Sequence, residues 1–481
     1  MLRTKSNAPR KAIRVGESSD PVDAPPPRGL TDIMPYIANT PEDQRAMLEA
    51  IGVASVEELF EAIPPELRLN GPLAIPPALS EMELTGRIAS LAATKQRTTE
   101  AGCFLGGGSY DHFIPAVVDH VAARGEFYTS YTPYQAEASQ GNLQAFFEYQ
   151  TLITRLTGMD VSNASLYDGG SAATEAVLMA ISATRRHGRV VTAASVHPEY
   201  RRILATYLAN LETELVTVGT PDGTIDPDEL KAALDEQTAC VLLQQPNFFG
   251  CLEAAESLVQ VTHDAGALAV VSVDPISLGL LKRPGDYEAD IVVAEGQSLG
   301  SPMSFGGPYL GVMACREAFV RRMPGRITGE TVDRRGKRCF VLTLQTREQH
   351  IRREKATSNI CTNQGLFALR ATVYLAALGP QGLRETAELC LRKARYAAQR
   401  IASEAPLQLA FDRPTFKEFV VRTTNNNVAP LLAAAGEQGF LAGVPLGRWY
   451  PELADCFLVT VTEKRTKGQI DALAECLQSR I

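Results

Sequence analysis

The stretch that decides the fold runs from Ala267 to Gly311 and reads ALAVVSVDPISLGLLKRPGDYEADIVVAEGQSLGSPMSFGGPYLG. One apolar strand in it ends at Asp274, and a second apolar run, 289–294, leads into a loop rich in Gly and Ser. Short, continuous apolar runs of this kind are typical of neighbouring strands buried in a parallel sheet. Because such sheets bind ligands at the carboxyl ends of their strands, we expect a site around Asp274 and the loop that follows the second strand.

The same pattern extends through the middle of the chain. Helical periodicity predicts helices over 141–157, ending at Gly158, and over 171–187, ending at Gly188. Apolar, β-branched runs predict buried strands at 190–192, 215–218, 240–243, 268–273, 291–294 and 309–314. Strands that alternate with helices predict an α/β domain with a mainly parallel, seven-stranded sheet covered on both faces.

Four parts are expected along the chain. Residues 1–33 are basic and then Pro-rich, without an apolar signal region, and we interpret them as a disordered extension. Residues 34–100 form a helical arm whose first helix starts at Thr40-Pro41. The large α/β domain covers 101–330. The α+β C-terminal domain covers 331–481, with a long helix broken near Gly379-Pro380, strands at 416–422 and 457–462, and a last helix at 467–478.

Composition excludes several classes of function. The formal net charge of −8 argues against non-specific nucleic-acid binding. There is no apolar run long enough to span a bilayer, so we expect no membrane partner. The nine cysteines are scattered without a C-x-x-C pair, which favours reduced thiols and a cytoplasmic protein. The six histidines form no spaced ligand set, so no metal site is expected.

Two features point to pyridoxal phosphate chemistry. The turn Asp168-Gly169-Gly170-Ser171 opens a helix, and a helix N-terminus favours a phosphate; the alternative is that Asp168 or Ser171 only caps the helix. Asp274 could pair with the protonated ring nitrogen of the cofactor, or it could be a turn former before Pro275. With the Gly/Ser loop, their order matches a fold type I pyridoxal-phosphate transferase.

A lysine is missing from this arrangement. An enzyme of that fold carries its Schiff-base lysine on the loop that here runs from Glu295 to Gly300, and the loop has none. No lysine occurs between Lys282 and Lys337. The chain is therefore built like a catalyst but lacks the amine that would anchor the cofactor.

Other polar segments are candidates, each with a structural alternative. The Tyr-rich stretch 125–141 suits a substrate pocket or an interface, or else a packed surface turn. Gly106–Gly108 could cradle an anion beside a titrating His112, and His197 could stack on a ring, although lone loop histidines are more often structural. The segment 346–364 could clamp an anion and offers Lys355 as a substitute Schiff-base lysine, or it is a solvated charged segment.

Five motifs together resemble the P-protein family of the glycine cleavage system, and within it the alpha subunits (subunit 1) of split glycine decarboxylases. They are LGGGSYDHFIPAVV (105–118), YTSYTPYQAEASQG (128–141), SLYDGGSAATEA (165–176), SFGGPYLG (304–311) and REQHIRREKATSNICTNQ (347–364). The resemblance covers about residue 34 to the C-terminus; 1–33 have no counterpart.

The resemblance implies an enzyme subunit that is active only in a complex. The family removes CO₂ from glycine and passes the aminomethyl group to the lipoyl arm of the H-protein. It implies an alpha2-beta2 heterotetramer in which subunit 2 holds pyridoxal 5'-phosphate covalently. The alpha subunit then contributes to an interface pocket, here through Tyr128, Tyr131, Pro133, Tyr134 and Gln135.

The resemblance also implies an emptied cofactor site in this chain, with no catalytic residue of its own. Its vestigial positions would be Ser171, Ala172, His197, Asp274 and Gln297. Two alternatives remain open: a self-sufficient decarboxylase or aminotransferase that uses Lys355, and a purely structural partner of subunit 2.

Overall fold

The computed structural model describes residues 39–69, 71, 73–93, 102–356, 358–403, 405–424 and 428–479, without the side chains of Arg352 and Lys355. The predicted disordered extension, 1–33, lies outside these ranges. Contacts divide the chain into Met1–Gly86 and Arg87–Ile481. Within the described ranges, every helix is too short or too polar to cross a membrane.

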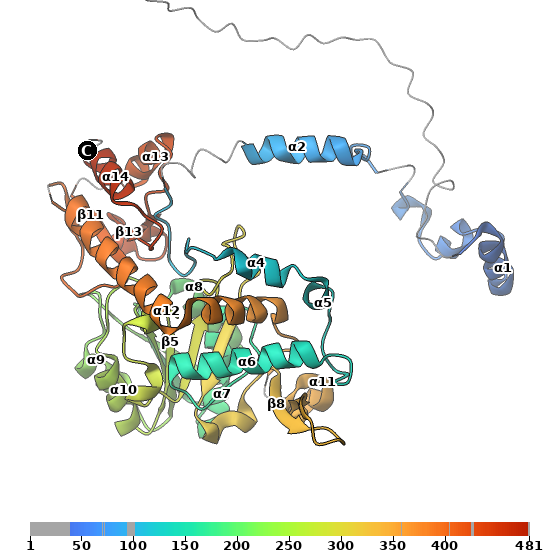
Figure 1. The fold of residues 1–481 in the computed structure, drawn as a ribbon, viewed down its shortest axis with the longest axis horizontal. Helices are drawn as coiled ribbons and strands as arrows, with labels where there is room; N and C mark the ends of the chain where they lie inside the picture. Colours follow the sequence, from blue (N-terminus) through green and yellow to red (C-terminus); the bar gives the residue numbers. More distant parts are fainter. Residues whose placement is uncertain are drawn as a thin grey trace, which may run out of the picture. The chain divides into compact units, whose positions relative to one another are not determined.

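The main unit is built on a seven-stranded sheet with the order β1-β7-β6-β5-β4-β2-β3 (Figure 1). Strands β2 to β6 pair in parallel, while β7 runs antiparallel to β6 and β1 antiparallel to β7. The strands are β1 (Val161–Ser162), β2 (Arg189–Ala193), β3 (Glu214–Val218), β4 (Thr238–Gln245), β5 (Leu268–Val273), β6 (Ile291–Glu295) and β7 (Gly311–Cys315). The predicted mainly parallel α/β sheet is confirmed.

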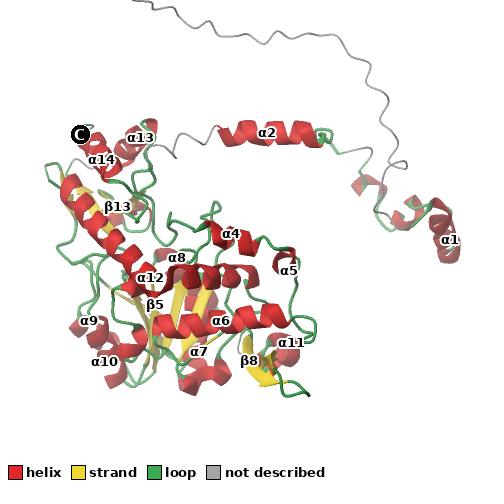
Figure 2. Ribbon diagram, in the orientation of Figure 1, coloured by secondary structure: helices red, strands yellow, loops and turns green. Residues whose placement is uncertain are grey.

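The central strands of this sheet are buried almost throughout, because helices cover it. Helix α7 (Gly169–Thr184) packs on β4 to β7, and α10 (Ala255–Asp264) packs on β4 and β5. Figure 2 shows α6 (Gln140–Thr157) and α12 (Gly365–Ile401) crossing in front of the strands. The connections also contain α8 (Pro198–Leu208) and α9 (Pro227–Ala233).

Local signals set several helix ends. Helix α6 ends at Gly158, which has a φ of 74°, as predicted. Helix α7 was predicted to end at Gly188, but Arg185 already adopts the left-handed conformation with a φ of 57°. Helix α12 is kinked at Gly379 before Pro380, where the sequence predicts a break.

A four-stranded sheet, β10-β11-β13-β12, forms the C-terminal part. Its elements are β10 (Leu407–Leu409), β11 (Glu418–Thr423), β12 (Val444–Pro445), β13 (Cys456–Thr460), α13 (Val428–Glu437) and α14 (Lys467–Gln478). The C-terminal end of α12 packs in the core of this four-stranded sheet, while the earlier part of the helix packs in the core of the large sheet.

A separate hairpin is formed by β8 (Ile327–Val332) and β9 (Arg338–Thr343), which were not predicted from the sequence. The domain boundaries after residues 100 and 330 stay predictions.

The N-terminal arm is described by itself. Thr40 caps α1 (Pro41–Ile51) in a capping box with Asp43, as the sequence predicts. Two short turns, η1 (Glu57–Phe60) and η2 (Pro65–Leu67), and α2 (Glu81–Ala93) follow. The apolar side chains of this arm are largely exposed in the isolated chain, Leu67 at 72% and Met82 at 82%.

Candidate functional site

The candidate site lies at the carboxyl ends of β4, β5 and β6, where the sequence predicts it. Asp274 follows β5 and Glu295 ends β6, and both line one depression. His197, the N-cap of α8, and Tyr200, in the first turn of that helix, line its wall. Lys417, which immediately precedes β11, enters it from the C-terminal part of the chain.

Asp274 is both a turn former and the partner of a cation. One carboxylate oxygen, Oδ1, accepts a hydrogen bond from the amide of Ile276 at 3.1 Å. The other, Oδ2, lies 2.8 Å from Nζ of Lys417. The side chain of Lys417 is 1% exposed, so this ion pair is fully inside the protein.

Lys417 has two more partners. Its Nζ lies 3.0 Å from Nε2 of His112 and 3.4 Å from the centre of the Tyr110 ring. A buried ammonium is costly unless it is paired and hydrogen-bonded, and these contacts together satisfy it.

His112 connects Lys417 to Glu463 through hydrogen bonds at its two ring nitrogens. Burial and the charge of Lys417 lower the pKa of His112, so the ring is neutral. Its Nε2 therefore accepts from Lys417, and its Nδ1–H donates to Oε2 of Glu463 at 2.6 Å. Burial opposes ionisation of Glu463, but the hydrogen bonds from His112 and the Phe113 amide outweigh it and lower the pKa of this carboxyl. These contacts support the structural alternative for His112 rather than titration near neutrality.

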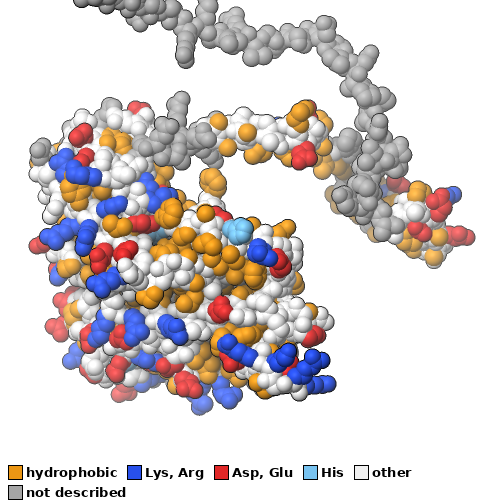
Figure 3. Space-filling model, in the orientation of Figure 1, with side chains coloured by type: hydrophobic (Ala, Val, Ile, Leu, Met, Phe, Trp, Pro, Cys, Tyr) orange, Lys and Arg blue, Asp and Glu red, His pale blue; other side chains and the backbone are white. Residues whose placement is uncertain are grey.

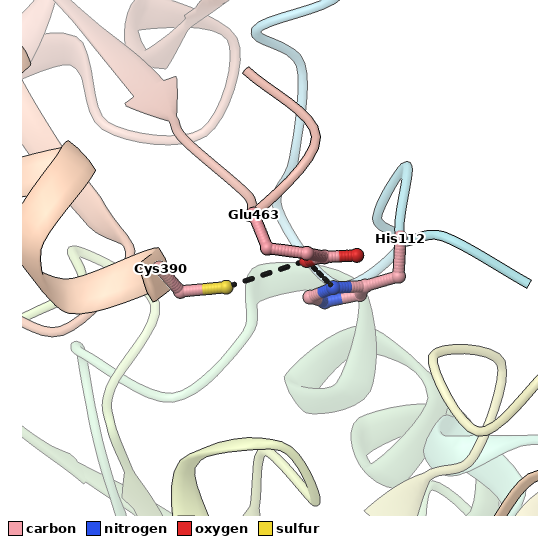
Figure 4. A group of neighbouring side chains, drawn as sticks. All are labelled: His112, Cys390 and Glu463. Atoms are coloured by element: carbon pink, nitrogen blue, oxygen red, sulfur yellow. Dashed lines mark hydrogen bonds and ion pairs between the residues drawn. The ribbon is translucent and has the colours of Figure 1, made fainter. Parts of the chain in front are cut away.

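His112, Cys390 and Glu463 form the one group in the described ranges with the spacing of a metal site (Figure 4). Each ligand atom is already used within the protein. The Cys390 thiol donates to Glu463 at 3.5 Å, and burial raises its pKa, so it stays protonated. With the Lys417 ammonium on the far side of His112, the group is a hydrogen-bond network rather than a cation site.

The N-terminus of α7 is covered by two carboxylates. Asp168 is the N-cap, and its Oδ1 accepts from the amide of Ser171 at 2.8 Å. Oε2 of Glu295 accepts from the amide of Gly169 at 2.9 Å. Ala172 is fully buried in the same first turn. The capping alternative for Asp168 is therefore the one observed.

Glu295 is held by three backbone amides. Its Oε1 accepts from the amides of Gln297 at 2.9 Å and Leu310 at 3.1 Å, in addition to Gly169 on Oε2. Burial outweighs these hydrogen bonds and raises its pKa to about 7. Gln297 is buried beside it and bonds with both backbone groups of Tyr110.

His197 has a fixed orientation. Its Nδ1 accepts from the amide of Glu199 at 3.1 Å, so Nε2 carries the proton and donates to the Gly107 carbonyl at 2.7 Å. Burial lowers its pKa to about 4. The sequence predicts that this ring could stack on another, and its partner is Tyr200, with centroids 4.5 Å apart and planes 19° apart.

The predicted anion cradle at Gly106–Gly108 holds an acid of the same chain. The amide of Gly107 donates to Oε1 of Glu418 at 2.8 Å. Tyr110 and Thr460 also donate to this buried carboxylate, through their hydroxyls.

The Tyr-rich stretch leads out of α5 (Gly125–Tyr128) to the surface. Tyr131 is 92% exposed, Tyr128 and Tyr134 are exposed to 60% and 52%, and Pro133 is buried. Gln135 is exposed as well. In Figure 3, hydrophobic side chains gather on the face that carries α4 (Ala116–Ala122), α5 and α12.

Sequence reasoning missed the residues that complete these networks. Lys417, Glu418 and Arg326 are buried charged side chains that meet the site or the Tyr-rich stretch. A signal was present, because Lys417-Glu418 interrupts the apolar run Phe416–Val421. Lys355, the predicted substitute for the Schiff-base lysine, lies in η7 (Arg353–Lys355), and its side chain is outside the described part of the chain.

Comparison of the sequence with known families and proteins points to one family. The model of the family described as glycine cleavage system P-protein matches residues 34–477. A probable glycine dehydrogenase (decarboxylating) subunit 1 from Carboxydothermus hydrogenoformans is 52% identical over 444 residues, covering 92% of this chain and 99% of the relative. Its counterpart from Geotalea uraniireducens is 53% identical over 448 residues, covering 93% and 100%.

Solved structures agree with these relatives. A crystal structure of glycine decarboxylase (P-protein) in inhibitor-bound form matches with a TM-score of 0.83 and 42% identity, over 93% of this chain and 100% of that one. A sphingosine-1-phosphate lyase from Burkholderia pseudomallei matches with a TM-score of 0.60 and 16% identity, over 87% and 94%. At that identity the likeness shows the fold alone.

Proposed function

Because the chain belongs to the glycine cleavage system P-protein family, we propose that it is the glycine decarboxylase subunit that does not carry the cofactor lysine. Together with subunit 2, in an alpha2-beta2 heterotetramer, it decarboxylates glycine and delivers the aminomethyl group to the lipoyl arm of the H-protein. Subunit 2 holds pyridoxal 5'-phosphate covalently and supplies the electron sink for decarboxylation.

The fold supports this proposal. It is the fold of type I pyridoxal-phosphate transferases, with Asp274 and the N-terminus of α7 at the ends of the strands. The single observation that carries the proposal is the side chain at Glu295, which starts the loop where the Schiff-base lysine is expected. A carboxylate there cannot form an imine.

The residues present do not fit a bound pyridoxal phosphate. The ring-nitrogen partner, Asp274, is already paired with Lys417. The helix N-terminus that would receive the phosphate already receives Glu295 and Asp168. The chain's role in catalysis is therefore proposed to lie at its surface, in the partner's pocket.

The surface that reaches the partner is proposed to be the Tyr-rich stretch. Tyr128, Tyr131, Tyr134 and Gln135 are exposed in the isolated chain and follow one another along a short segment anchored by the buried Pro133. Exposed aromatic rings beside an apolar face are the composition of interface hot spots.

Reconstitution tests the proposal. The absorbance of bound cofactor and glycine-dependent CO₂ exchange are measured for this chain, for subunit 2 and for their mixture. We expect an aldimine band wherever subunit 2 is present, and exchange activity in the mixture alone. A band and exchange with this chain by itself would favour the self-sufficient alternative.

A further inference from the structure

We propose that this chain fills its cofactor site with its own side chains and thereby excludes pyridoxal phosphate. Lys417 replaces the protonated ring nitrogen, and Glu295 replaces the phosphate. Tyr200 replaces the aromatic ring. The inference concerns this chain's own pocket, so it stands or falls independently of the reaction proposed with subunit 2.

At the end of the site where the ring nitrogen would lie, the Lys417 ammonium has the charge and the position of a protonated pyridine nitrogen. A pyridinium would present one N–H⁺ to Asp274, and the Lys417 ammonium presents one at 2.8 Å. Lys417 cannot swing away cheaply, because His112 and the face of Tyr110 hold its other sides in the protein interior. A cofactor ring would have to displace a buried cation and leave it unpaired.

At the phosphate end, a carboxylate occupies the helix N-terminus. Glu295 accepts the Gly169 amide with one oxygen and two loop amides with the other, which is how backbone amides bind an anionic group. The two glycines of this turn are closely packed from behind as well. A Cβ on Gly169 would meet the Tyr200 hydroxyl, and one on Gly170 would meet Ile203.

Between the two ends, at the place proposed for the cofactor ring, the chain has aromatic rings of its own. The face of His197 is covered by Tyr200 in a near-parallel stack. Two depressions lie on this side of the protein, and both are lined by Gly108, His197, Tyr200 and Glu295. The depression with Asp274 and Lys417 and the one with Asp168 and Gly170 therefore adjoin each other, and Tyr200 and Glu295 lie where the two meet.

The test reopens each end of the site in turn. Three probes are titrated into the full-length chain by calorimetry: deoxypyridoxine phosphate, which lacks the aldehyde and cannot form an imine with surface lysines, unphosphorylated deoxypyridoxine, and inorganic phosphate. The variants are Lys417→Met, Glu295→Ser and the two combined. Glu199→Ser is the matched control, because Glu199 lines the same depression as Glu295 but is partly exposed.

The expected affinities differ between the variant of the phosphate end and the variant of the ring-nitrogen end. The native chain and Glu199→Ser should bind none of the probes below about 1 mM. Glu295→Ser should gain affinity for phosphate, and Lys417→Met for deoxypyridoxine, whose ring nitrogen then meets Asp274. The combined variant should bind deoxypyridoxine phosphate at least about tenfold more tightly than the native chain.

Two results would overturn the inference. One is binding of deoxypyridoxine phosphate by the native chain with an affinity like that of the combined variant. The other is a folded combined variant, judged by near-UV circular dichroism, that gains no affinity. If the combined variant does not fold, the two single variants carry the test, and a folded single variant without its end-specific gain overturns the inference.

Discussion

The guanidinium of Arg326 lies 5.5 Å from the centre of the Tyr134 ring, and its Nη2 donates to the Tyr134 hydroxyl at 3.1 Å. Arg326 itself is 2% exposed, while Tyr134 is 52% exposed. The same guanidinium donates to the Cys361 carbonyl at 2.9 Å. The buried arginine therefore ties the proposed interface segment to the chain that leads into α12.

Arg326→Met should destabilise the chain by about 3 kcal/mol, because it removes the guanidinium whose Nε lies 4.0 Å from the buried carboxylate of Glu348. The free energy of unfolding in urea measures this. Arg338→Met is the matched control, since Arg338 pairs with Glu330 at the surface and should lose less than about 1 kcal/mol. Equal losses in both variants would contradict a special role for Arg326.

Tyr131→Ala should reduce glycine-dependent CO₂ exchange of the reconstituted complex by at least about tenfold. The side chain is 92% exposed, so the unfolding free energy of the isolated chain should change by less than about 0.5 kcal/mol. Tyr207→Ala, on the surface of α8, serves as the control and should leave exchange unchanged. Full turnover of Tyr131→Ala and of Tyr128→Phe in an intact complex would instead favour a purely structural subunit.

The pH dependence of stability should report on Glu295. Its pKa is raised by burial from 4.5 to about 7, so the folded chain holds an extra proton between these values. The free energy of unfolding contributed by Glu295 therefore falls as pH rises through that window, by roughly 2 to 3 kcal/mol between pH 5 and pH 8.

Glu295→Gln removes this titration. The difference in unfolding free energy between the variant and the native chain should shift in favour of the variant by that amount from pH 5 to pH 8. Other groups, such as Glu175 and His197, titrate in both proteins and cancel in the difference. Parallel pH curves for the two proteins would show that Glu295 titrates as an ordinary carboxyl.

Gly106→Ala should lower the unfolding free energy by about 2 kcal/mol or more, measured in urea. A Cβ at this position would clash with the Thr460 hydroxyl and the Glu418 carboxylate, which form one hydrogen-bonded unit. Gly125→Ala at the start of α5 is the control, because its Cβ would meet nothing within 4 Å. A neutral Gly106→Ala would mean that β11 and β13 can move apart at this point.

Elements with a local physical cause could be predicted closely. The predicted apolar runs correspond to β2 to β7. Thr40 caps α1, Gly158 ends α6 and Gly379 kinks α12, and each of these effects is local to the residue that causes it. The hairpin of β8 and β9 was missed because β8 is exposed over its second half, 330–332, and β9, although apolar over 339–342, is mostly only half-buried, so neither strand has a continuous buried face to mark it.

The absence of a lysine from the Glu295–Gly300 loop is a property of the sequence alone, and so is the place of Asp274 at a strand end. Tertiary structure decided which cation pairs with Asp274, because Lys417 immediately precedes β11, a strand of the other sheet that is distant in the sequence. The bond of Glu295 to the Gly169 amide was decided in the same way, by the packing of α7 on β6, whereas the stack of Tyr200 on His197 joins residues three positions apart at the start of α8. Charge pairing in a protein interior depends on proximity in space, and only the packing of the C-terminal part against the large sheet brings Lys417 within hydrogen-bonding distance of Asp274.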